Sequence, residues 1–160
     1  MKILGIDPGL RKTGYGLIEC KDSKIKLLEA GVIRPKEKDT LENRLSKIYS
    51  NLEDIVNEYK PEVMVIEKLY THYQLPTTAC LLGHVRGVIY LLCAKCRLRL
   101  AEHSVKRIRK AVMGSGAASK MQTQGMVAHI LRIDAKQLTP DASDALALAL
   151  GYAQITSSKI

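Results

Sequence analysis

Four acidic side chains occur where folding could bring them together. Asp7 follows the short apolar run 3–6 and precedes a Pro-Gly pair, and Glu67 follows a second apolar run. Asp141 and Asp144 lie three residues apart, where a segment rich in alanine and leucine begins. An acid at the end of a buried strand points its charge out of the sheet, and acids three apart share one face of a helix. Adjacent strand ends and a helix N-terminus could therefore gather all four carboxylates.

Clustered carboxylates are the hard oxygen ligands that select Mg²⁺ or Mn²⁺. Two such ions about 3.5 to 4 Å apart can activate water and stabilise the leaving oxygen of an in-line displacement at phosphorus. Each acid alone has a simpler interpretation: a strand-end acid can pair with a base, and acids are favoured in the first turn of a helix. The four acids together favour metal-dependent hydrolysis of a phosphodiester.

Positive charge is concentrated in one part of the chain. The 160 residues include 25 Lys and Arg against 16 Asp and Glu, a net charge of +9. The segment 97–120 holds one acid, Glu102, and seven bases: Arg97, Arg99, Lys106, Arg107, Arg109, Lys110 and Lys120. A solvated face is the ordinary interpretation of such a run, but its density favours a polyanionic partner such as nucleic acid.

Periodicity predicts an α/β fold that would position these groups. We expect strands ending at Asp7 and over 13–20, 25–34, 63–67 and 98–101, and helices over 40–59, 77–96, from 104, 119–131 and 140–155. The first three strands would form an antiparallel meander, and strands alternating with helices imply a mixed five-stranded sheet with helices on both faces. We expect one domain over 1–156 and a tail over 157–160.

The helix expected over 77–96 is apolar on more than one side, which we interpret as a subunit interface. His84 and Arg86 interrupt its apolar run, so we expect a buried helix and no membrane span. The chain begins with no stretch of signal-peptide form. Its four cysteines lie in apolar stretches and are expected to be reduced, which favours the cytoplasm.

Several motifs occur together in one order along the chain. They are 3–9 (ILGIDPG) with 13–16 (TGYG), Ile66-Glu67, Gly83 with Arg86-Gly87, 109–112 (RKAV) with Gly114 and Gly116, and 141–147 (DASDALA). In this order they resemble RuvC, the bacterial family of Holliday junction resolvases, from residue 1 to about residue 152. Each motif alone is weak, but the collinear set is specific.

The resemblance implies a ribonuclease H-like fold and a homodimer. It also implies an endodeoxyribonuclease that resolves four-way DNA junctions in recombination and repair, by paired nicks that leave 5′-phosphate ends. The matching acids, Asp7, Glu67, Asp141 and Asp144, would be catalytic and would hold Mg²⁺, with Mn²⁺ as a substitute and two ions in the DNA-bound site. The family also implies the branch-migration complex RuvA–RuvB as a partner.

The resemblance extends to DNA contacts. Tyr70 lies where the family commonly has Phe near the junction centre, and Arg109 and Lys120 match basic positions near the scissile phosphate. Further DNA contacts are expected from Arg86, Lys106, Arg107 and Lys110. The loop 71–76 departs from the family pattern, and His84 replaces a common Gln, which we interpret as packing or polar surface.

Other functions fit the sequence less well. A different ribonuclease H-like nuclease and an inactive junction-binding module both share the acids and the basic segment. Half of a sugar-kinase or actin-like ATPase would also place an acid before glycines, but that architecture requires two such domains. Cys93 and Cys96 form a lone Cys-x-x-Cys pair, which disfavours a zinc or redox site.

Overall fold

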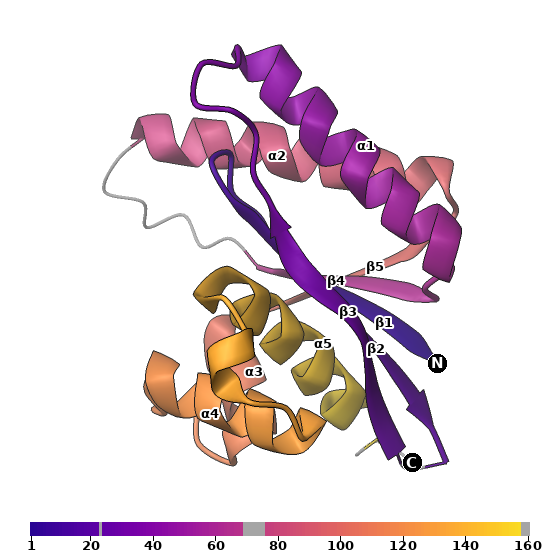
Figure 1. Cartoon of the computed structure of the whole chain (residues 1–160), viewed down its shortest axis with the longest axis vertical. Helices are drawn as coiled ribbons and strands as arrows, with labels where there is room; N and C mark the ends of the chain where they lie inside the picture. The colour runs from indigo at the N-terminus through magenta and orange to yellow at the C-terminus, as the bar shows by residue number, and fades with distance from the viewer. Residues whose placement is uncertain (23, 69–75, 158–160) are drawn as a thin grey trace.

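The computed structural model describes residues 1–22, 24–68 and 76–157. A five-stranded sheet of order β3-β2-β1-β4-β5 lies between helices on both faces (Figure 1). The strands are β1 (Lys2–Asp7), β2 (Thr13–Lys21), β3 (Lys24–Ile33), β4 (Val63–Glu67) and β5 (Arg99–His103). The helices are α1 (Leu41–Tyr59), α2 (Pro76–Lys95), α3 (Val105–Met113), α4 (Lys120–Leu131), the short 3₁₀ helix η1 (Ala135–Gln137) and α5 (Pro140–Ser157).

The sheet has an antiparallel half and a parallel half. Strands β1, β2 and β3 form the expected meander, in which Asp7 pairs with Gly14. Strand β4 runs parallel to β1, with Ile6 beside Ile66, and β5 runs parallel to β4. The prediction of a mixed five-stranded sheet with helices on both faces is confirmed.

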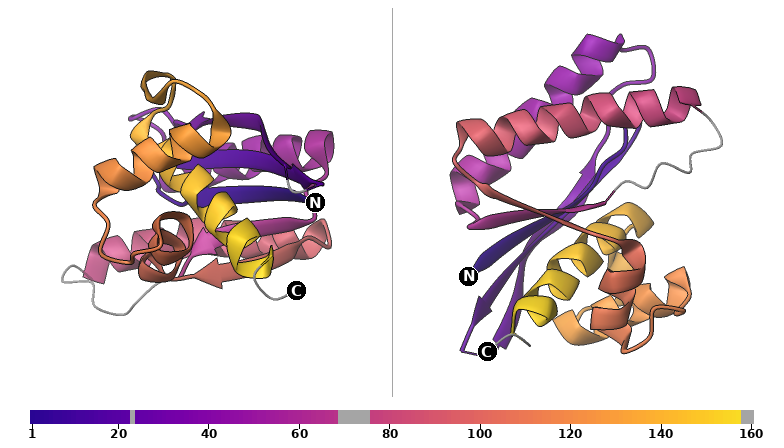
Figure 2. Two further views of the ribbon diagram at one scale, coloured as in Figure 1. Left: turned by 90° about the horizontal axis from the view of Figure 1, so that it is seen from below. Right: turned by 180° about the vertical axis from the view of Figure 1, so that it is seen from behind.

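Alternation along the strands divides the core in two. Leu4 and Met64 face one cluster, which α1 and α2 cover, whereas Ile3 and Val65 face the other, which α3, α4 and α5 cover. Figure 2 shows these two helical layers with the sheet between them. Because side chains alternate along a strand, residues 3, 5 and 7 of β1 lie on the α5 side.

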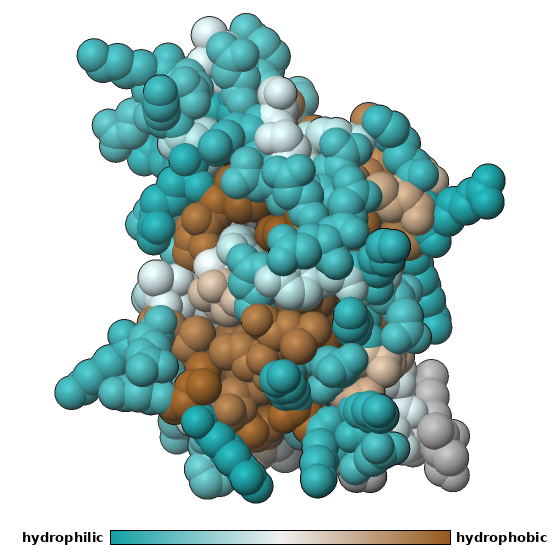
Figure 3. All heavy atoms as spheres, turned by 45° about the vertical axis from the view of Figure 1, so that its right-hand side comes forward, coloured by the Kyte–Doolittle hydropathy of each residue, from teal (hydrophilic) through white to brown (hydrophobic). Residues whose placement is uncertain are grey.

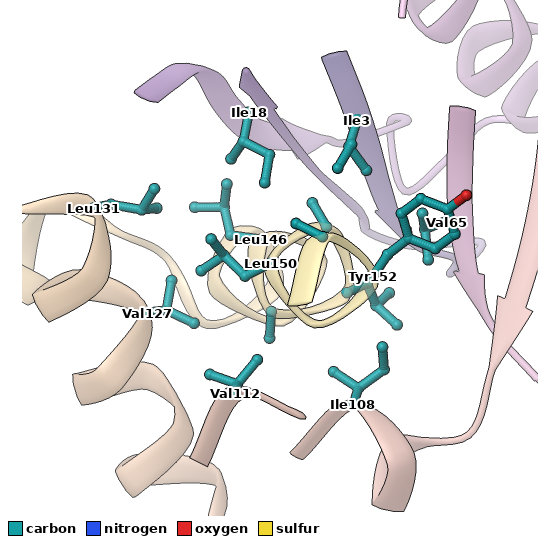
Figure 4. Close-up of a cluster of buried hydrophobic side chains, with 14 of the residues drawn as sticks. Ile3, Ile18, Val65, Ile108, Val112, Val127, Leu131, Leu146, Leu150 and Tyr152 are labelled. Carbon is teal, nitrogen blue, oxygen red and sulfur yellow. The ribbon is translucent and has the colours of Figure 1, made fainter. Parts of the chain in front are cut away.

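Helix α5 is the centre of the second cluster. Figure 4 shows it surrounded by Ile3 and Ile18 from the sheet, Ile108 and Val112 from α3, and residues of α4. Ala142, Ser143 and all residues from 145 to 153 are buried. A helix buried on every side has no polar stripe, which explains why its sequence is apolar all round.

Helix α2 differs from the expected buried helix. Val85, Ile89 and Leu92 are fully buried, but Tyr90 is 42% and Leu91 55% exposed. The segment 77–95 is long and apolar enough to cross a membrane by length and composition alone. Its packing against α1 and the sheet accounts for one face only.

The remaining differences from the predicted elements are small. Strand β5 begins one residue and ends two residues later than expected, α5 continues to Ser157, and η1 was not predicted. On the face drawn in Figure 3, apolar residues gather in the middle and hydrophilic residues surround them. The expected loop 71–76 lies almost wholly outside the described residues, which resume at residue 76.

Candidate active site

Asp7 and Glu67 end two neighbouring parallel strands. The register that places Ile6 beside Ile66 places these acids next to each other at the same edge of the sheet. Alternation directs both side chains to the α5 face, because Ile3 and Val65 of the same strands face the α5 cluster. The expected pairing of the two strand-end acids is therefore present.

Glycines in the sheet allow α5 to approach closely enough to bring its acids to the same edge. A Cβ atom at Gly14 would lie 2.1 Å from the Asp141 carbonyl oxygen, and one at Gly5 would lie 2.0 Å from that of Ala145. Neither position could carry a side chain without displacing the helix. Glycine is used here for close approach of two backbones.

The acids open into a pocket of about 310 Å³. Its polar lining is Asp7, Glu67, Arg109, Lys120, Thr123 and Asp144, and its apolar lining is Val105, Ile108, Ala147 and Leu148. Strands β1 and β4 and helices α3, α4 and α5 thus each contribute to one cavity. Asp141 lies one turn before Asp144 in α5 and is not part of the lining.

Asp7 lies in an environment that opposes its ionisation. Burial raises its pKa to about 7, and the nearby charges of Asp144, Glu67 and Asp141 contribute in that order, while Lys120 acts in the opposite direction. Three carboxylates acting on a fourth show that the four predicted acids form one electrostatic cluster. A cation placed among them would offset the repulsion between the carboxylates and favour the ionised form of Asp7 against the effect of its burial.

Glu67 shows a similar but more balanced effect. Burial and then the charge of Asp144 raise its pKa, whereas Arg86 and Arg109 lower it. Arg109 comes from the pocket side, on α3, and Arg86 comes from α2 on the other side of the sheet. The charges of two guanidinium groups, one on each side of the sheet, therefore act on Glu67.

Lys120 forms an ion pair with Asp144 at the pocket. It is the first residue of α4, behind the N-cap Ser119, which forms a capping box with Gln122. The bond to Asp144 is also the main cause that raises the pKa of Lys120. The capped helix start thus places an ammonium group against the acidic cluster.

The donor set suits a hard divalent cation, because its four members are carboxylates. Within residues 1–22, 24–68 and 76–157, no three His, Cys, Asp or Glu side chains form a preassembled metal cage. The acids are close enough to shift the pKa of Asp7 but do not already share one coordination sphere. Their chemistry fits the ion, and the carboxylates would have to approach one another to bind it.

The predicted basic residues fall into separate groups. Arg109 and Lys120 line the pocket, and Lys106, Arg107 and Lys110 are exposed on α3. Arg97 and Arg99 precede or begin β5, whose last residue lies beside Glu67. Four strand residues, about 13 Å, separate Arg99 from that edge, so Arg97 and Arg99 lie apart from the bases at the pocket. Tyr70 lies outside the described residues.

Arg86 has a different place from the one expected. It is 5% exposed, and its guanidinium bonds the Glu67 carbonyl oxygen, the Tyr90 hydroxyl and the Glu102 carboxylate. A guanidinium with these three partners has no free face for a phosphate, so its assignment as a DNA contact is not supported. Sequence reasoning missed Tyr90 and Glu102; the four-residue spacing of Arg86 and Tyr90 indicated a shared helix face, whereas Glu102 required the β4–β5 register.

The other sequence candidates lie away from this pocket. Cys93 is buried beside Met64, with sulfur atoms 3.7 Å apart, and burial raises its pKa to about 11, which opposes thiolate chemistry. His84 is exposed on α2, and its Nδ1 lies 2.8 Å from the Cys80 carbonyl oxygen. This agrees with its interpretation as polar surface.

Comparison with known proteins gives a consistent result. The family described as "Crossover junction endodeoxyribonuclease RuvC" matches residues 3–152. A RuvC protein from Legionella pneumophila (strain Lens) is 39% identical over 153 residues, which cover 96% of this chain and 87% of that protein. Sequence similarity thus extends over nearly the whole chain.

Solved structures agree in fold. The Thermus thermophilus RuvC structure superposes with a TM-score of 0.90 at 23% identity, covering 99% of this chain and 97% of that chain. The same protein in complex with a Holliday junction substrate gives a TM-score of 0.89 at 21% identity, covering 99% and 96%. The expected ribonuclease H-like fold is confirmed, and with the extent of the family match it follows that this chain belongs to the RuvC family of crossover junction endodeoxyribonucleases.

Proposed function

We propose that this chain is a homodimeric endodeoxyribonuclease that resolves four-way DNA junctions by paired nicks leaving 5′-phosphate ends, in recombination and repair. The convergence of Asp7, Glu67 and Asp144 on one pocket rimmed by Arg109 and Lys120 carries this proposal. Acids that can hold cations beside bases that can hold phosphate are what phosphodiester hydrolysis requires. The RuvC homologue solved with a Holliday junction substrate supports the choice of DNA structure.

The family consists of metal-dependent nucleases, and we assign the ligand role to Asp7, Glu67, Asp141 and Asp144. Mg²⁺ is the ion of choice, with Mn²⁺ as a substitute and two ions in the DNA-bound site. Bound there, the ions would activate the attacking water and offset charge on the phosphate and the leaving oxygen. Asp7 must lose its proton to act as a ligand, and a cation beside it favours that loss.

The bases have two roles in this proposal. Arg109 and Lys120 hold the scissile phosphate, and Lys120 exchanges its bond with Asp144 for one with a phosphate oxygen. Lys106, Arg107 and Lys110, exposed on α3, bind the backbone on either side. Tyr70 would stack on a base near the junction centre, as the family position suggests.

The dimer would form through the exposed face of α2. This face carries Cys80, Gly83, His84, Gly87 and Leu91, which line a shallow apolar groove together with Val88. Two copies of such a face would bury what one chain leaves open. Paired nicks in opposing strands require two active sites, which a dimer supplies.

The rest of the assignment follows the family. We propose that residues 1–156 act as the single nuclease domain, with 157–160 as its tail. The protein would work in the cytoplasm with RuvA–RuvB as its branch-migration partner.

The deciding experiment incubates the protein with a synthetic four-way junction and Mg²⁺. We expect paired nicks from the wild type and a loss of at least about 10³-fold in rate for Asp7→Asn and Asp144→Asn, with junction binding kept. Asp54→Asn, an exposed acid on α1, is the matched control and should cut normally. Binding without cutting by every variant, the wild type included, would instead identify a junction-binding module.

A further inference from the structure

The far side of the Glu67 strand end carries a polar cluster around the buried Arg86, which the proposed chemistry does not use. It consists of Arg86 and Tyr90 on α2 and Glu102 on β5, and we call it the Arg86 cluster. We propose that the Arg86 cluster positions Glu67: it fixes the main chain of this acid from behind, so that its carboxylate is presented correctly to the pocket. This inference rests on the role of Glu67 as a metal ligand proposed above.

The contact to Glu67 is direct. Arg86 Nη1 donates a hydrogen bond of 2.6 Å to the Glu67 carbonyl oxygen, on the last residue of β4. The next residue, Lys68, donates its backbone N–H to the His103 carbonyl oxygen at 2.9 Å. The strand end is thus held on one side by the β5 ladder and on the other by α2.

The guanidinium is itself held in place. Its Nη2 donates to the Tyr90 hydroxyl at 2.8 Å and to the Glu102 carboxylate, and Tyr90 donates to the same carboxylate oxygen at 2.7 Å. The Arg86 guanidinium carbon also lies 5.6 Å from the Tyr90 ring centroid. These contacts fix the orientation of a planar group whose donors point in set directions.

The alternation of side chains along the strands explains how Glu67 can have neighbours on both faces of the sheet. The Glu67 side chain lies on the α5 face, whereas Glu102, one residue past Ala101, lies on the α2 face with Leu100. The Arg86 cluster therefore approaches the backbone of Glu67 without occupying the pocket. A buried arginine is costly unless fully paired, and here its charge is matched by Glu102.

A purely structural role would also join α2 to the sheet, so the test must separate position from stability. Glu102→Gln keeps the size of the side chain but removes its charge, and Arg86→Lys keeps the charge but removes the guanidinium that bonds several partners at once. Tyr90→Phe removes one hydroxyl. The matched control is Tyr49→Phe on α1. There Tyr49 donates to Glu53 at 2.7 Å and Lys95 lies 5.1 Å from its ring, far from the pocket.

The readouts are Mn²⁺ affinity of the DNA-free protein by calorimetry, the Mg²⁺ concentration for half-maximal junction cleavage, and junction affinity in Ca²⁺. For Glu102→Gln and Arg86→Lys we expect Mn²⁺ affinity to fall and the Mg²⁺ requirement to rise by about tenfold, with junction affinity unchanged. Tyr90→Phe should lower the Mn²⁺ affinity and raise the Mg²⁺ requirement by about threefold each. Tyr49→Phe should leave all three values unchanged.

Two outcomes would overturn the inference. One is a folded Glu102→Gln protein with wild-type Mn²⁺ affinity and Mg²⁺ requirement; the other is an equal change in Tyr49→Phe. Tyr90→Phe keeps the test valid if the charge variants do not fold, because Tyr90 lies partly exposed. Glu67→Gln tests the proposed ligand role by itself: normal cleavage by that variant would refute the ligand role, whatever the Arg86 cluster does.

Discussion

Helices α5 and α2 have similar sequences but opposite surroundings. They contain 18 and 20 residues, and both are apolar nearly all round. In α5 an almost unbroken run from Ala142 to Ala153 is buried between the sheet, α3 and α4. In α2 the described buried residues form one stripe, and Leu91 on the opposite side is 55% exposed.

The difference shows that two helices that are apolar on every side can be buried to different extents by the rest of the chain. The chain itself covers every side of α5, so the helix is fixed and can hold Asp141 and Asp144 against the strand ends. It covers one side of α2, whose buried stripe contributes to the core and holds Arg86, and it leaves the other side exposed, where we propose that a second copy binds.

The largest effect is expected where α5 meets the sheet. Gly14→Ala would place a Cβ atom 2.1 Å from the Asp141 carbonyl oxygen, so the helix must shift, and we expect a loss of about 3 kcal/mol in the free energy of unfolding. Urea denaturation measures it. Gly125→Ala on α4 is the control, because its added Cβ would meet nothing within 4 Å beyond its chain neighbours and the backbone of its own helix. Equal effects of the two substitutions would contradict the tight seating of α5.

An intermediate effect on stability is expected from the acids clustered around Asp7. Burial and three carboxylates raise the pKa of Asp7 from 3.8 to about 7, so between these values the folded protein binds the extra proton. Without metal, stability should therefore fall as the pH rises from about 4 to about 7. Asp7→Asn removes this cost and should stabilise the metal-free protein at pH 8 by on the order of 2 kcal/mol.

Thermal unfolding with and without Mg²⁺ checks this result. The gain from Asp7→Asn should shrink at pH 4, where the wild-type carboxyl is already protonated, and should reverse when Mg²⁺ stabilises the wild type. Asp54→Asn on α1 should show neither trend. A metal-free Asp7→Asn protein that is less stable than the wild type at pH 8 would contradict the clustering of the acids.

The smallest effect on chain stability is expected on α2. Leu91→Glu places a charge on its exposed face and should change the free energy of unfolding of the monomer by no more than about 0.5 kcal/mol. It should nevertheless convert the dimer to a monomer in analytical ultracentrifugation, because the charge would be buried in the interface. Met121→Glu, at a residue 79% exposed on α4, should remain dimeric. A dimeric Leu91→Glu protein would exclude this face as the interface.

The sequence alone predicted most of the elements and the four acids. The short apolar runs before Asp7 and Glu67 predict both the strands and the residues at which they end, because these are local properties of the sequence. The collinear motifs predicted the fold, which the structure confirms. Helix α1 was predicted within one residue because its apolar period is complete and Thr40 precedes it as N-cap.

Only the tertiary structure decided what these local features face. The β4–β5 register that joins Glu102 to Arg86, the glycine contacts that seat α5, and the ion pair of Lys120 with Asp144 all link residues distant in the chain. The burial of Arg86 and the exposure of Leu91 on one helix are decided in the same way. A local pattern states which side chains are apolar or charged, whereas packing determines which neighbours they meet. At this site those neighbours raise the pKa of Asp7 and bond the main chain of Glu67.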